Sequence, residues 1–554
     1  MKRGWYDAQS SGGEEADFEL DDELMLQTLP PPILASQTPS ITPAAAYTHP
    51  FSDTMRHGGN ARVGRHDNLA LYAQYVVAGV LRGATDYVTF GVVPSYYGVD
   101  KATVTSMVNV SQVVWNCRVV AGMLSDMCPL VGYRRKSYMF LGWFTYGVCL
   151  LVVAAMSPSI QDIHQGERLL LLLSVALAPF VLMSAALDAR FVEMAQREPL
   201  ETRGRLQAMT HATSLGGRLA GTLSVHVILR SLSHHVVLGC LAAPCFVMAG
   251  LSVATLHEPT KPIVNCPDYI ADVWALVQTR VMWRVLLFKL VFQVLTTNAM
   301  WRTDASMQAL SVWLAPRGSS MPFMPSIWYL MPLTAASVAA IVTIGLVGRA
   351  WNYRTILVST LATYVVVHGT STMLAIFVDA CRSPLVYATL GQAATACMPI
   401  LQLVSSFVFV ELAPPGKEGL TFGLLATIET LPDSLFPCFQ YLRNLLVQLD
   451  AEAILRDTAA VRAKAAASLA ISYAMCVVAA ALVVLMPRQK DHVQFLLAYG
   501  GKQPVAAAIV LAVSVALVVM ALVASCVPSI YPLPPLPFGG PATNTSNATM
   551  PPPA

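Results

Sequence analysis

Apolar runs of about 20 residues recur along this chain, and short polar loops separate them. A helix needs about 20 apolar residues to cross roughly 30 Å of hydrocarbon, so each run predicts a membrane-spanning helix. The first runs lie at about 69–93, 103–124, 138–157, 168–189, 206–228 and 236–256. After a polar, amphipathic connector at 258–283, a second set lies at about 285–303, 325–348, 354–378, 386–411, 419–442 and 466–486.

Polar and proline-rich segments flank the spans. Residues 1–67 lack apolar periodicity and carry an acidic patch and a Pro/Thr/Ser-rich stretch, so we expect a disordered cytoplasmic N-terminal tail. They contain no early apolar segment, so we expect no cleavable signal peptide. A charged linker at 488–504 leads to one further, uncharged span at 505–527, and a Pro-rich tail follows at 528–554.

This layout predicts an all-α, polytopic membrane protein. Two sets of six spans predict two six-helix bundles, at 68–257 and 284–487, as in the major facilitator fold. The span at 505–527 is then an extra, thirteenth transmembrane helix. One long irregular bundle is the alternative interpretation of the same runs.

Composition favours the bilayer as the main solvent of the chain. Hydrophobic residues make up 55% of its 554 residues and charged residues 12%, against about 25% in soluble proteins. The net charge of +3 gives no support for nucleic-acid binding. The 11 cysteines have no metal or disulfide spacing, and we expect neither a metal nor a cofactor.

Positive charge predicts the orientation of the spans. With a cytoplasmic N-terminus, about 21 of the 35 Lys and Arg residues fall on the cytoplasmic side, as the positive-inside rule requires. The loop 443–464 is an exception, because its basic residues are predicted outside. Glycosylation sequons at Asn544 and Asn547 agree with a C-terminus outside the cell after thirteen spans.

The loop between the second and third spans carries a compact motif. It reads Gly-Met-Leu-Ser-Asp from Gly122 to Asp126 and then Gly-Tyr-Arg-Arg from Gly132 to Arg135. Gly122 would let two helices approach closely, and Asp126 would pair with basic groups or with a neighbouring helix terminus. The alternative is a positively charged cytoplasmic anchor with a turn glycine.

The end of the fourth span is rich in charge. On a helix, Arg190 and Glu193 are three residues apart and Glu193 and Arg197 are four apart, so both pairs can interact along one face. The alternative is a helix end that neutralises itself. Asp188 argues against this alternative, because it lies too far inside an apolar run to be merely solvated.

Three segments in this order, 122–135, 188–204 and 411–419, resemble motifs of the folate–biopterin transporter family of the major facilitator superfamily. The resemblance covers nearly all of 69–527. It implies the facilitator fold and secondary transport of folates or pterins, with protons. The residues to which it gives structural or gating roles are Gly122, Asp126, Gly132, Arg134, Arg135, Arg190, Glu193, Arg197, Arg203, Gly204, Glu411, Gly416 and Glu418.

The second span departs from the pattern of that family. Where the family usually has Pro-Trp-x-x-Lys, this chain has Val-Trp-Asn-Cys-Arg at 114–118. The tryptophan and the positive charge are kept and the proline is not, which leaves the bending of the helix and the choice of substrate open. The family also includes transporters of S-adenosylmethionine, so the resemblance does not identify the ligand.

Charged side chains within the predicted spans are the candidates for substrate binding, since an unpaired charge at that depth costs roughly 2.5–3.5 kcal/mol or more. Folate is a dianion that needs cations, its pterin edge matches one carboxylate, and its pterin face can stack on an aromatic ring. The alternative for each charge is an ion pair between helices: Arg82 and Asp86 could satisfy each other, and Arg190 would keep Asp188 ionised. The candidates are Arg82, Asp86, Trp115, Arg118, Asp188, Lys289 and Trp301.

Glu429 and Asp433 are the candidates for proton coupling. They lie one turn apart in the eleventh span, which contains no basic residue near them. Two carboxylates that close in a low dielectric resist double ionisation, so we expect one of them to bind a proton. The alternative is that Glu429 caps a helix break at Pro432 and faces a watery cavity.

These patterns together predict a proton-coupled secondary transporter of folate or pteridine substrates, and not an enzyme, since the chain shows no nucleophile–base pair or phosphate-binding loop. The alternatives are a transporter of S-adenosylmethionine or another small metabolite, and a non-transporting membrane receptor. We expect a monomer in the plasma membrane, with the small-molecule substrate, protons and lipid as its partners and no nucleic acid.

The positive-charge bias and the sequons predict a cytoplasmic N-terminus and an external C-terminus. An epitope tag at each end, probed by antibody on intact cells, should give a signal for the C-terminal tag alone, and permeabilised cells should give both. An N-terminal tag that is accessible on intact cells would contradict this orientation.

Overall fold

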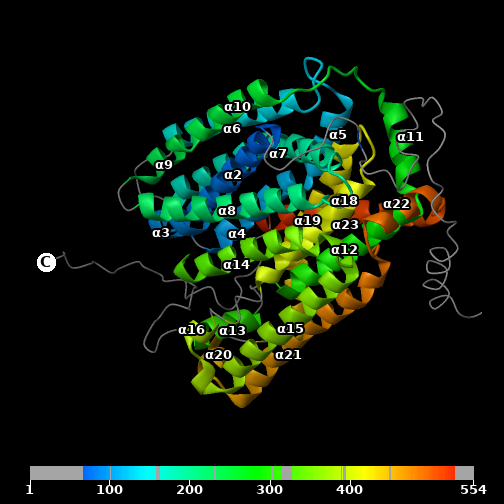
Figure 1. Ribbon diagram of the computed structural model, residues 1–554. Coiled ribbons are helices and arrows are strands. Elements are labelled where there is room, and N and C mark those ends of the chain that lie inside the picture. The colour runs from blue at the N-terminus through cyan, green and yellow to red at the C-terminus, as the bar shows by residue number, and fades with distance from the viewer. Residues whose placement is uncertain are drawn as a thin grey trace, which may run out of the picture. The chain divides into compact units, whose positions relative to one another are not determined.

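The computed structural model describes residues 56, 66–99, 101–156, 163–229, 232–300, 305–314, 327–387, 390, 395–447, 449 and 451–530 (Figure 1). In these residues the elements are helices, and two isolated β-bridges accompany them. Trp301 and the sequons at Asn544 and Asn547 lie outside the described residues, as does the N-terminal tail except for Arg56 and the last two positions.

Helices coincide with the first six predicted spans. In chain order they are α2 (His66–Tyr87) continued by η2 (Val88–Val92) and α3 (Val93–Tyr97), α4 (Lys101–Asn116) with α5 (Arg118–Met127), α6 (Lys136–Met156), α7 (Ile163–Ala195), α8 (Arg205–Ile228), and α9 (His234–Cys240) with α10 (Ala242–Thr255). The predicted connector contains α11 (Cys266–Val277).

Helices also coincide with the later predicted spans. They are α12 (Arg280–Met300), α14 (Ile327–Leu346), α15 (Tyr353–Phe377), α18 (Met398–Leu412), α19 (Glu418–Leu446), α21 (Ala459–Ala481) and α23 (Pro504–Ile530). Shorter helices lie between them, namely α13 (Ala305–Trp313), α16 (Pro384–Val386), α20 (Ala451–Arg456) and α22 (Lys490–Tyr499).

Eight helical segments among the described residues are long and apolar enough to cross a membrane, and two apolar helices are shorter. Predicted spans at α4–α5, α8 and α19 are not among these eight, because polar and charged residues interrupt their apolar runs. The polytopic all-α class is therefore confirmed. The number of twelve spans plus one, and the domain boundaries, stay predictions.

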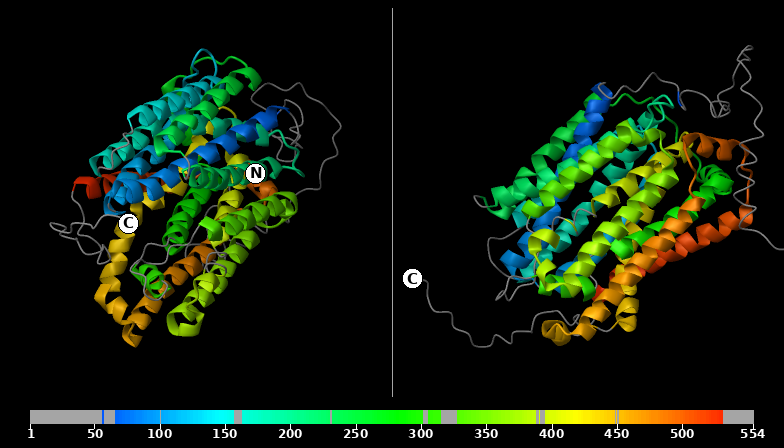
Figure 2. Two further views of the ribbon diagram at one scale, coloured as in Figure 1. Left: turned by 90° about the vertical axis from the view of Figure 1, so that its left-hand side faces the viewer. Right: turned by 60° about the horizontal axis from the view of Figure 1, so that its bottom comes forward.

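The helices form two groups that meet along their length (Figures 1 and 2). The first group, α2 to α10, occupies the upper part of Figure 1, and the second, α12 to α21, the lower part. Where the groups meet, α8 packs on α14, and α4 and α5 pack on α19. Helix α23 contacts α4, α12 and α19, so it lies against both groups at one seam.

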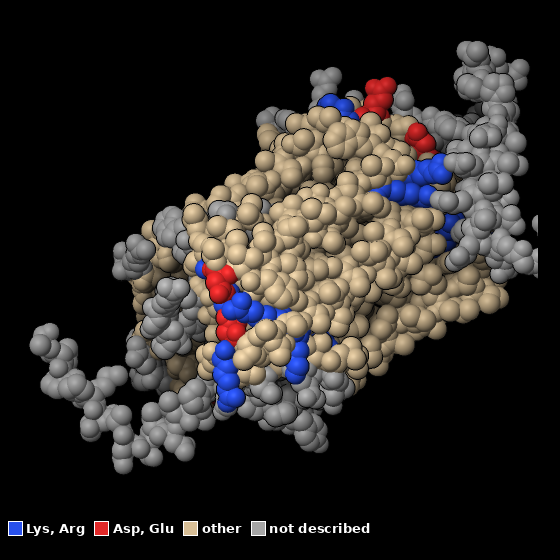
Figure 3. All heavy atoms as spheres, turned by 90° about the horizontal axis from the view of Figure 1, so that it is seen from below, with Lys and Arg blue, Asp and Glu red and all other residues tan. Residues whose placement is uncertain are grey.

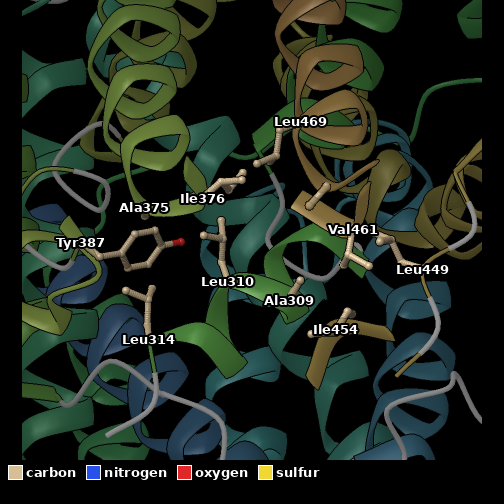
Figure 4. Packing of buried hydrophobic residues seen from close by; sticks show 11 residues of the cluster. Ala309, Leu310, Leu314, Ala375, Ile376, Tyr387, Leu449, Ile454, Val461 and Leu469 are labelled. Carbon is tan, nitrogen blue, oxygen red and sulfur yellow. The ribbon is translucent and has the colours of Figure 1, made fainter. Parts of the chain in front are cut away.

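The outer surface agrees with a lipid environment. A broad apolar surface separates charged side chains that gather at two ends of the molecule (Figure 3). At one end, a cluster of buried apolar residues joins α13, α15, α20 and α21 (Figure 4). Beside it, Arg462 binds Asp457 at 2.8 Å and Asp379 at 3.1 Å. Arg462, one of the basic residues that made 443–464 an exception to the charge bias, therefore has its charge balanced by aspartates.

Glycines allow α2 and α8 to pack backbone to backbone. A Cβ atom on Gly217 or Gly221 of α8 would overlap the main-chain carbonyl of Val76 or Val80 of α2. The constant offset between these contacts shows that the two helices run parallel and in register. A Cβ atom on the neighbouring Gly216 would meet open space.

This packing predicts opposite effects for two adjacent substitutions. Gly217→Ala should destabilise the protein by about 1–3 kcal/mol, because overpacking forces the backbones apart. Gly216→Ala should be neutral or slightly stabilising, because alanine favours the helix. Thermal unfolding of the detergent-solubilised protein measures both, and equal melting temperatures for the two variants would contradict the α2–α8 contact.

Candidate functional site

The helix of the second predicted span is interrupted in its middle. Helix α4 ends at Asn116 and α5 begins at Arg118, and between them Cys117 has φ −79° and ψ 5°. The side chain of Asn116 donates to Ser434 Oγ at 2.8 Å and accepts from Thr430 Oγ1 at 3.0 Å, both on α19. The helix is therefore interrupted although the proline of the family is absent. The side chain of Asn116 connects the first group of helices to the second.

Two arginines lie close to the ring of Trp115. The guanidinium carbon of Arg82 is 4.2 Å from the centre of the indole ring, and that of Arg118 is 5.6 Å away. The indole edge also meets Phe180, with ring centroids 5.9 Å apart. A flat aromatic ring with cations beside it suits a planar substrate that carries negative charge.

Asp188 forms an ion pair with Arg118 of α5 and accepts a hydrogen bond of 2.7 Å from the Tyr75 hydroxyl of α2. The expectation that Arg190 keeps Asp188 ionised is wrong, because Arg190 binds Glu193 at 3.0 Å. Residues two apart on a helix point to different sides, so Asp188 and Arg190 face different neighbours.

Asp86 takes its closest partner from another helix. Its carboxylate lies 2.8 Å from Arg218 of α8 and 3.9 Å from Nε of Arg82. The expected pair of Arg82 and Asp86 is present at this longer distance, Arg218 is the closer partner of Asp86, and the guanidinium of Arg82 also lies against Trp115. The glycines allow α8 to pack closely against α2, and this brings Arg218 near enough to be the closest partner of Asp86.

Glu429 also has a basic partner. Nζ of the fully buried Lys289, on α12, lies 3.2 Å from its carboxylate. Lys289 further donates to Gln293 Oε1 at 2.9 Å and to Ser405 Oγ of α18 at 3.0 Å. The lack of a basic residue near Glu429 within its own span therefore does not leave it unpaired, because the partner comes from a helix 140 positions earlier in the chain.

Asp433 has a different environment from Glu429. Within the described part of the chain its carboxylate has neither a hydrogen bond nor an ion pair, while Arg82 and Arg218 lie within electrostatic reach. The two acidic residues of α19 therefore face different cations. They do not form the like-charge pair that their spacing indicates.

At one end of the molecule, Arg135 is buried among three carboxylates from both groups. Its guanidinium lies 2.6 Å from Asp126, 2.8 Å from Glu418 and 3.1 Å from Glu193. Burial alone would lower the pKa of Arg135, but the carboxylates of Asp126 and Glu193 raise it above its ordinary value. Asp126 also accepts hydrogen bonds from the first turn of α19, at Leu420 N (2.8 Å).

A second buried pair joins the two groups at the same end. Arg203 donates to both carboxylate oxygens of Glu411 at 3.0 and 3.1 Å, and Gln494 of α22 donates to Glu411 at 2.8 Å. We call this end, with segments 126–135, 198–204, 411–418 and 490–494, the closed end. It lies to the right in Figure 1, where α5, α11, α18 and α22 meet.

Two titratable groups accompany this pair. Glu198 accepts hydrogen bonds from the backbone N–H groups of Gly204 (3.1 Å) and Leu206 (3.2 Å), and burial raises the pKa of Glu198 to about 7 despite them. Lys490 donates to the Arg203 carbonyl, and burial lowers the pKa of Lys490 to about 8. Hydration on opening would return the pKa of Glu198 towards its lower ordinary value. Acidification through about pH 7 therefore favours the buried position of Glu198, whereas acidification towards about pH 8 disfavours the buried position of Lys490.

The remaining motif residues shape the loops of the closed end. Gly132, Gly204 and Gly416 have φ of +82°, +114° and +87°, which a residue with a side chain adopts only with strain. Arg134 donates its backbone N–H to Glu258 at 2.9 Å, and Arg197 lies in the turn after α7. Gly122 meets Gly419 with no room for a Cβ atom.

Several contacting residues escaped the sequence analysis. Tyr75, Ser405 and Gln494 are polar residues of ordinary types, and no spacing relates them to their partners. Gln293 is the exception, because it lies four residues after Lys289 on the same helical face. Arg218 is a charge within a predicted span and the partner of the candidate Asp86, but it lies on another helix, so no spacing relates the two.

Comparison with known proteins adds a family and a fold. The chain matches the model of the BT1 family over residues 79–494. A folate-biopterin transporter of Synechocystis sp. (strain ATCC 27184 / PCC 6803 / Kazusa) is 25% identical over 381 residues, which cover 66% of this chain and 72% of that protein.

Solved transporter structures share the fold. The proton:xylose symporter XylE of the major facilitator superfamily, bound to 6-bromo-6-deoxy-D-glucose, matches with a TM-score of 0.55 and 11% identity, over 77% of this chain and 98% of its own. A bacterial homologue of the iron transporter ferroportin, in an outward-facing state, matches with a TM-score of 0.52 and 12% identity, over 76% and 98%. The predicted facilitator-type fold is thereby confirmed.

The closed end can be tested through Glu411. Glu411→Gln leaves Arg203 buried without its counter-charge, which costs about 3 kcal/mol or more and corresponds to a shift of roughly a hundredfold towards opening. Amide hydrogen exchange in 198–210 should rise accordingly. The matched control is Glu201→Gln, an exposed glutamate in the same loop, and equal exchange in the two variants would contradict a role of the Arg203–Glu411 pair in holding the closed end together.

Proposed function

Because this chain belongs to the BT1 family, we propose that it carries folate or pteridine substrates across a membrane as a secondary transporter driven by protons. Transport by a multi-pass membrane protein is the activity that its family and fold have in common. The pteridine substrate class is supported by the name of the relative from Synechocystis and by the chemistry of the central residues.

The observation that carries the proposal is the set of charges around Trp115. Arg82 and Arg118 lie close to the indole, and a pterin ring could stack there beside the two guanidinium groups. Arg118 and Lys289 would bind carboxylates of the substrate, because Lys289 is buried, Arg118 is half-buried, and the present partners of both are carboxylates. Asp188 would orient Arg118, and Asp86 would orient Arg82 and Arg218.

A proton would enter when the substrate displaces a carboxylate of the protein. Glu429, released from Lys289, would become an unpaired anion at membrane depth unless it binds a proton. Asp433 is the second candidate for the residue that binds the transported proton, because its protonation breaks no contact within the described residues.

The closed end would be the gate that alternates. Its ion pairs join the two groups of helices, so the central residues would open towards it only after Arg135–Glu418 and Arg203–Glu411 separate. The arrangement described here would then be closed to the cytoplasm, with the motif residues as structural or gating elements.

S-adenosylmethionine is the alternative substrate. It carries a sulfonium cation, and Asp433, with no contact in the described residues, could bind that charge. Uptake of labelled folate, biopterin and S-adenosylmethionine in cells that lack their own carriers distinguishes the two proposals. Saturable uptake of S-adenosylmethionine, with no uptake of folate or biopterin, would contradict the assignment of pteridines as the substrate class.

The anion-binding role predicts a difference between two pterins. Arg118→Gln, or Lys289→Met combined with Glu429→Gln to remove both charges of the pair, should weaken transport of folate more than that of uncharged biopterin. A lost charge-assisted hydrogen bond is worth about 1.5–3 kcal/mol, so the folate KM should rise roughly 10- to 150-fold.

The control for this comparison is Arg382→Gln. Arg382 pairs with Asp457 near the loop 443–464, away from Trp115, so its loss should affect both pterins alike. Equal losses for folate and biopterin in the Arg118 and Lys289 variants would identify structural ion pairs instead.

A further inference from the structure

The middle of the membrane-spanning helices is electrically balanced. Among the described residues, the charged side chains at least seven residues inside either end of their spans comprise four cations and four carboxylates. They are Arg82, Arg118, Arg218 and Lys289, and Asp86, Asp188, Glu429 and Asp433. Net charge at this depth is costly, and this arrangement of the protein's own charges avoids it.

Two of the carboxylates each contact one cation, and each such pair lies within a single group of helices. Arg118 and Asp188 belong to α5 and α7, and Lys289 and Glu429 to α12 and α19. If Glu429 withdraws, Lys289 keeps its hydrogen bonds to Gln293 and Ser405, which hold the ammonium group in place for another carboxylate.

A substrate carboxylate that binds Lys289 or Arg118 therefore replaces a carboxylate of the protein. The cation stays paired, and the displaced Glu429 or Asp188 is left as an extra negative charge in a low dielectric. One proton on the displaced carboxylate restores the balance. After the exchange the cation is paired with the substrate carboxylate, and the displaced residue is a neutral acid.

We propose that this transporter moves one proton with each carboxylate of its substrate, with Glu429 and Asp188 as the proton acceptors. The proposal rests on the proposed function and adds a rule for its coupling. A pterin without a carboxylate displaces neither pair and moves no proton.

Other titratable and charged groups face these acceptors. His211 of α8 lies within electrostatic reach of Lys289, and Tyr75 of α2 donates to Asp188. Asp86 and Asp433 face Arg82 and Arg218, which a carboxylate at Lys289 or Arg118 leaves undisturbed. His211 is therefore the competing acceptor that the experiment has to separate from Glu429.

The experiment uses the full chain in proteoliposomes that contain a pH-sensitive dye, at neutral external pH. Three substrates share one pterin head: biopterin has no carboxylate, pteroate has one and folate has two. We expect zero, one and two protons per molecule, and initial rates that do not change when valinomycin and potassium impose a membrane potential. A proton number that is the same for all three, or transport of folate that carries net charge, would overturn the rule.

Variants then identify the acceptors. Glu429→Gln or Asp188→Asn should each lower the proton number of folate by one, make its transport sensitive to the potential, and leave biopterin at zero. His211→Gln should keep two protons for folate, and a decrease there would move the role from Glu429 to the imidazole. The wild-type series decides the rule even if a variant does not fold. Absence of transport for all three pterins would overturn the proposed substrate class, whereas transport with a constant proton number would overturn the proton rule alone.

Discussion

Charge that is removed from water has to meet its opposite within the protein, and this constraint arranges the whole molecule. The ion pairs in the middle of the spans, Arg118–Asp188 and Lys289–Glu429, each lie within one group of helices. The pairs at the closed end, Arg135–Glu418 and Arg203–Glu411, join the two groups. Relative motion of the groups can therefore leave the central pairs intact, whereas it has to break the pairs at the end. The location of an ion pair thus separates the charges that we propose to bind substrate from those that we propose to hold the gate.

The spans could be predicted from the sequence because lipid imposes one requirement on every helix that crosses it. The predicted run 354–378 and α15 (Tyr353–Phe377) differ by a single residue at each end. The predicted run 386–411 begins well before α18 (Met398–Leu412), because apolar character continues through the short 3-10 turn Thr395–Cys397. An apolar run shows which residues can lie in lipid. It does not show at which of these residues the regular hydrogen bonding of the helix begins.

The partners of the central charges could not be predicted in the same way. Helical spacing shows which residues share a face, and it correctly relates Arg190 to Glu193. It cannot show which other helix covers that face. Asp86 therefore has its closest partner in Arg218, and Glu429 has Lys289, although both partners are visible in the sequence as charges within spans. The glycines of α2 and α8 bring one of these partners close, and no charge pattern reveals them.

Helix α23 gives the molecule unequal sides. Its first residues are tied to the start of α12, where Gln503 N donates to the Gln278 carbonyl at 2.8 Å and Arg280 N to the Gly501 carbonyl at 3.1 Å. From there α23 lies on both α4 and α19, so it covers the seam between them, while α18 contacts both α8 and α14 at the other seam. Acyl chains are therefore kept away from the first seam. A hydrophobic compound dissolved in the bilayer would therefore meet α23 before it could reach the seam between α4 and α19.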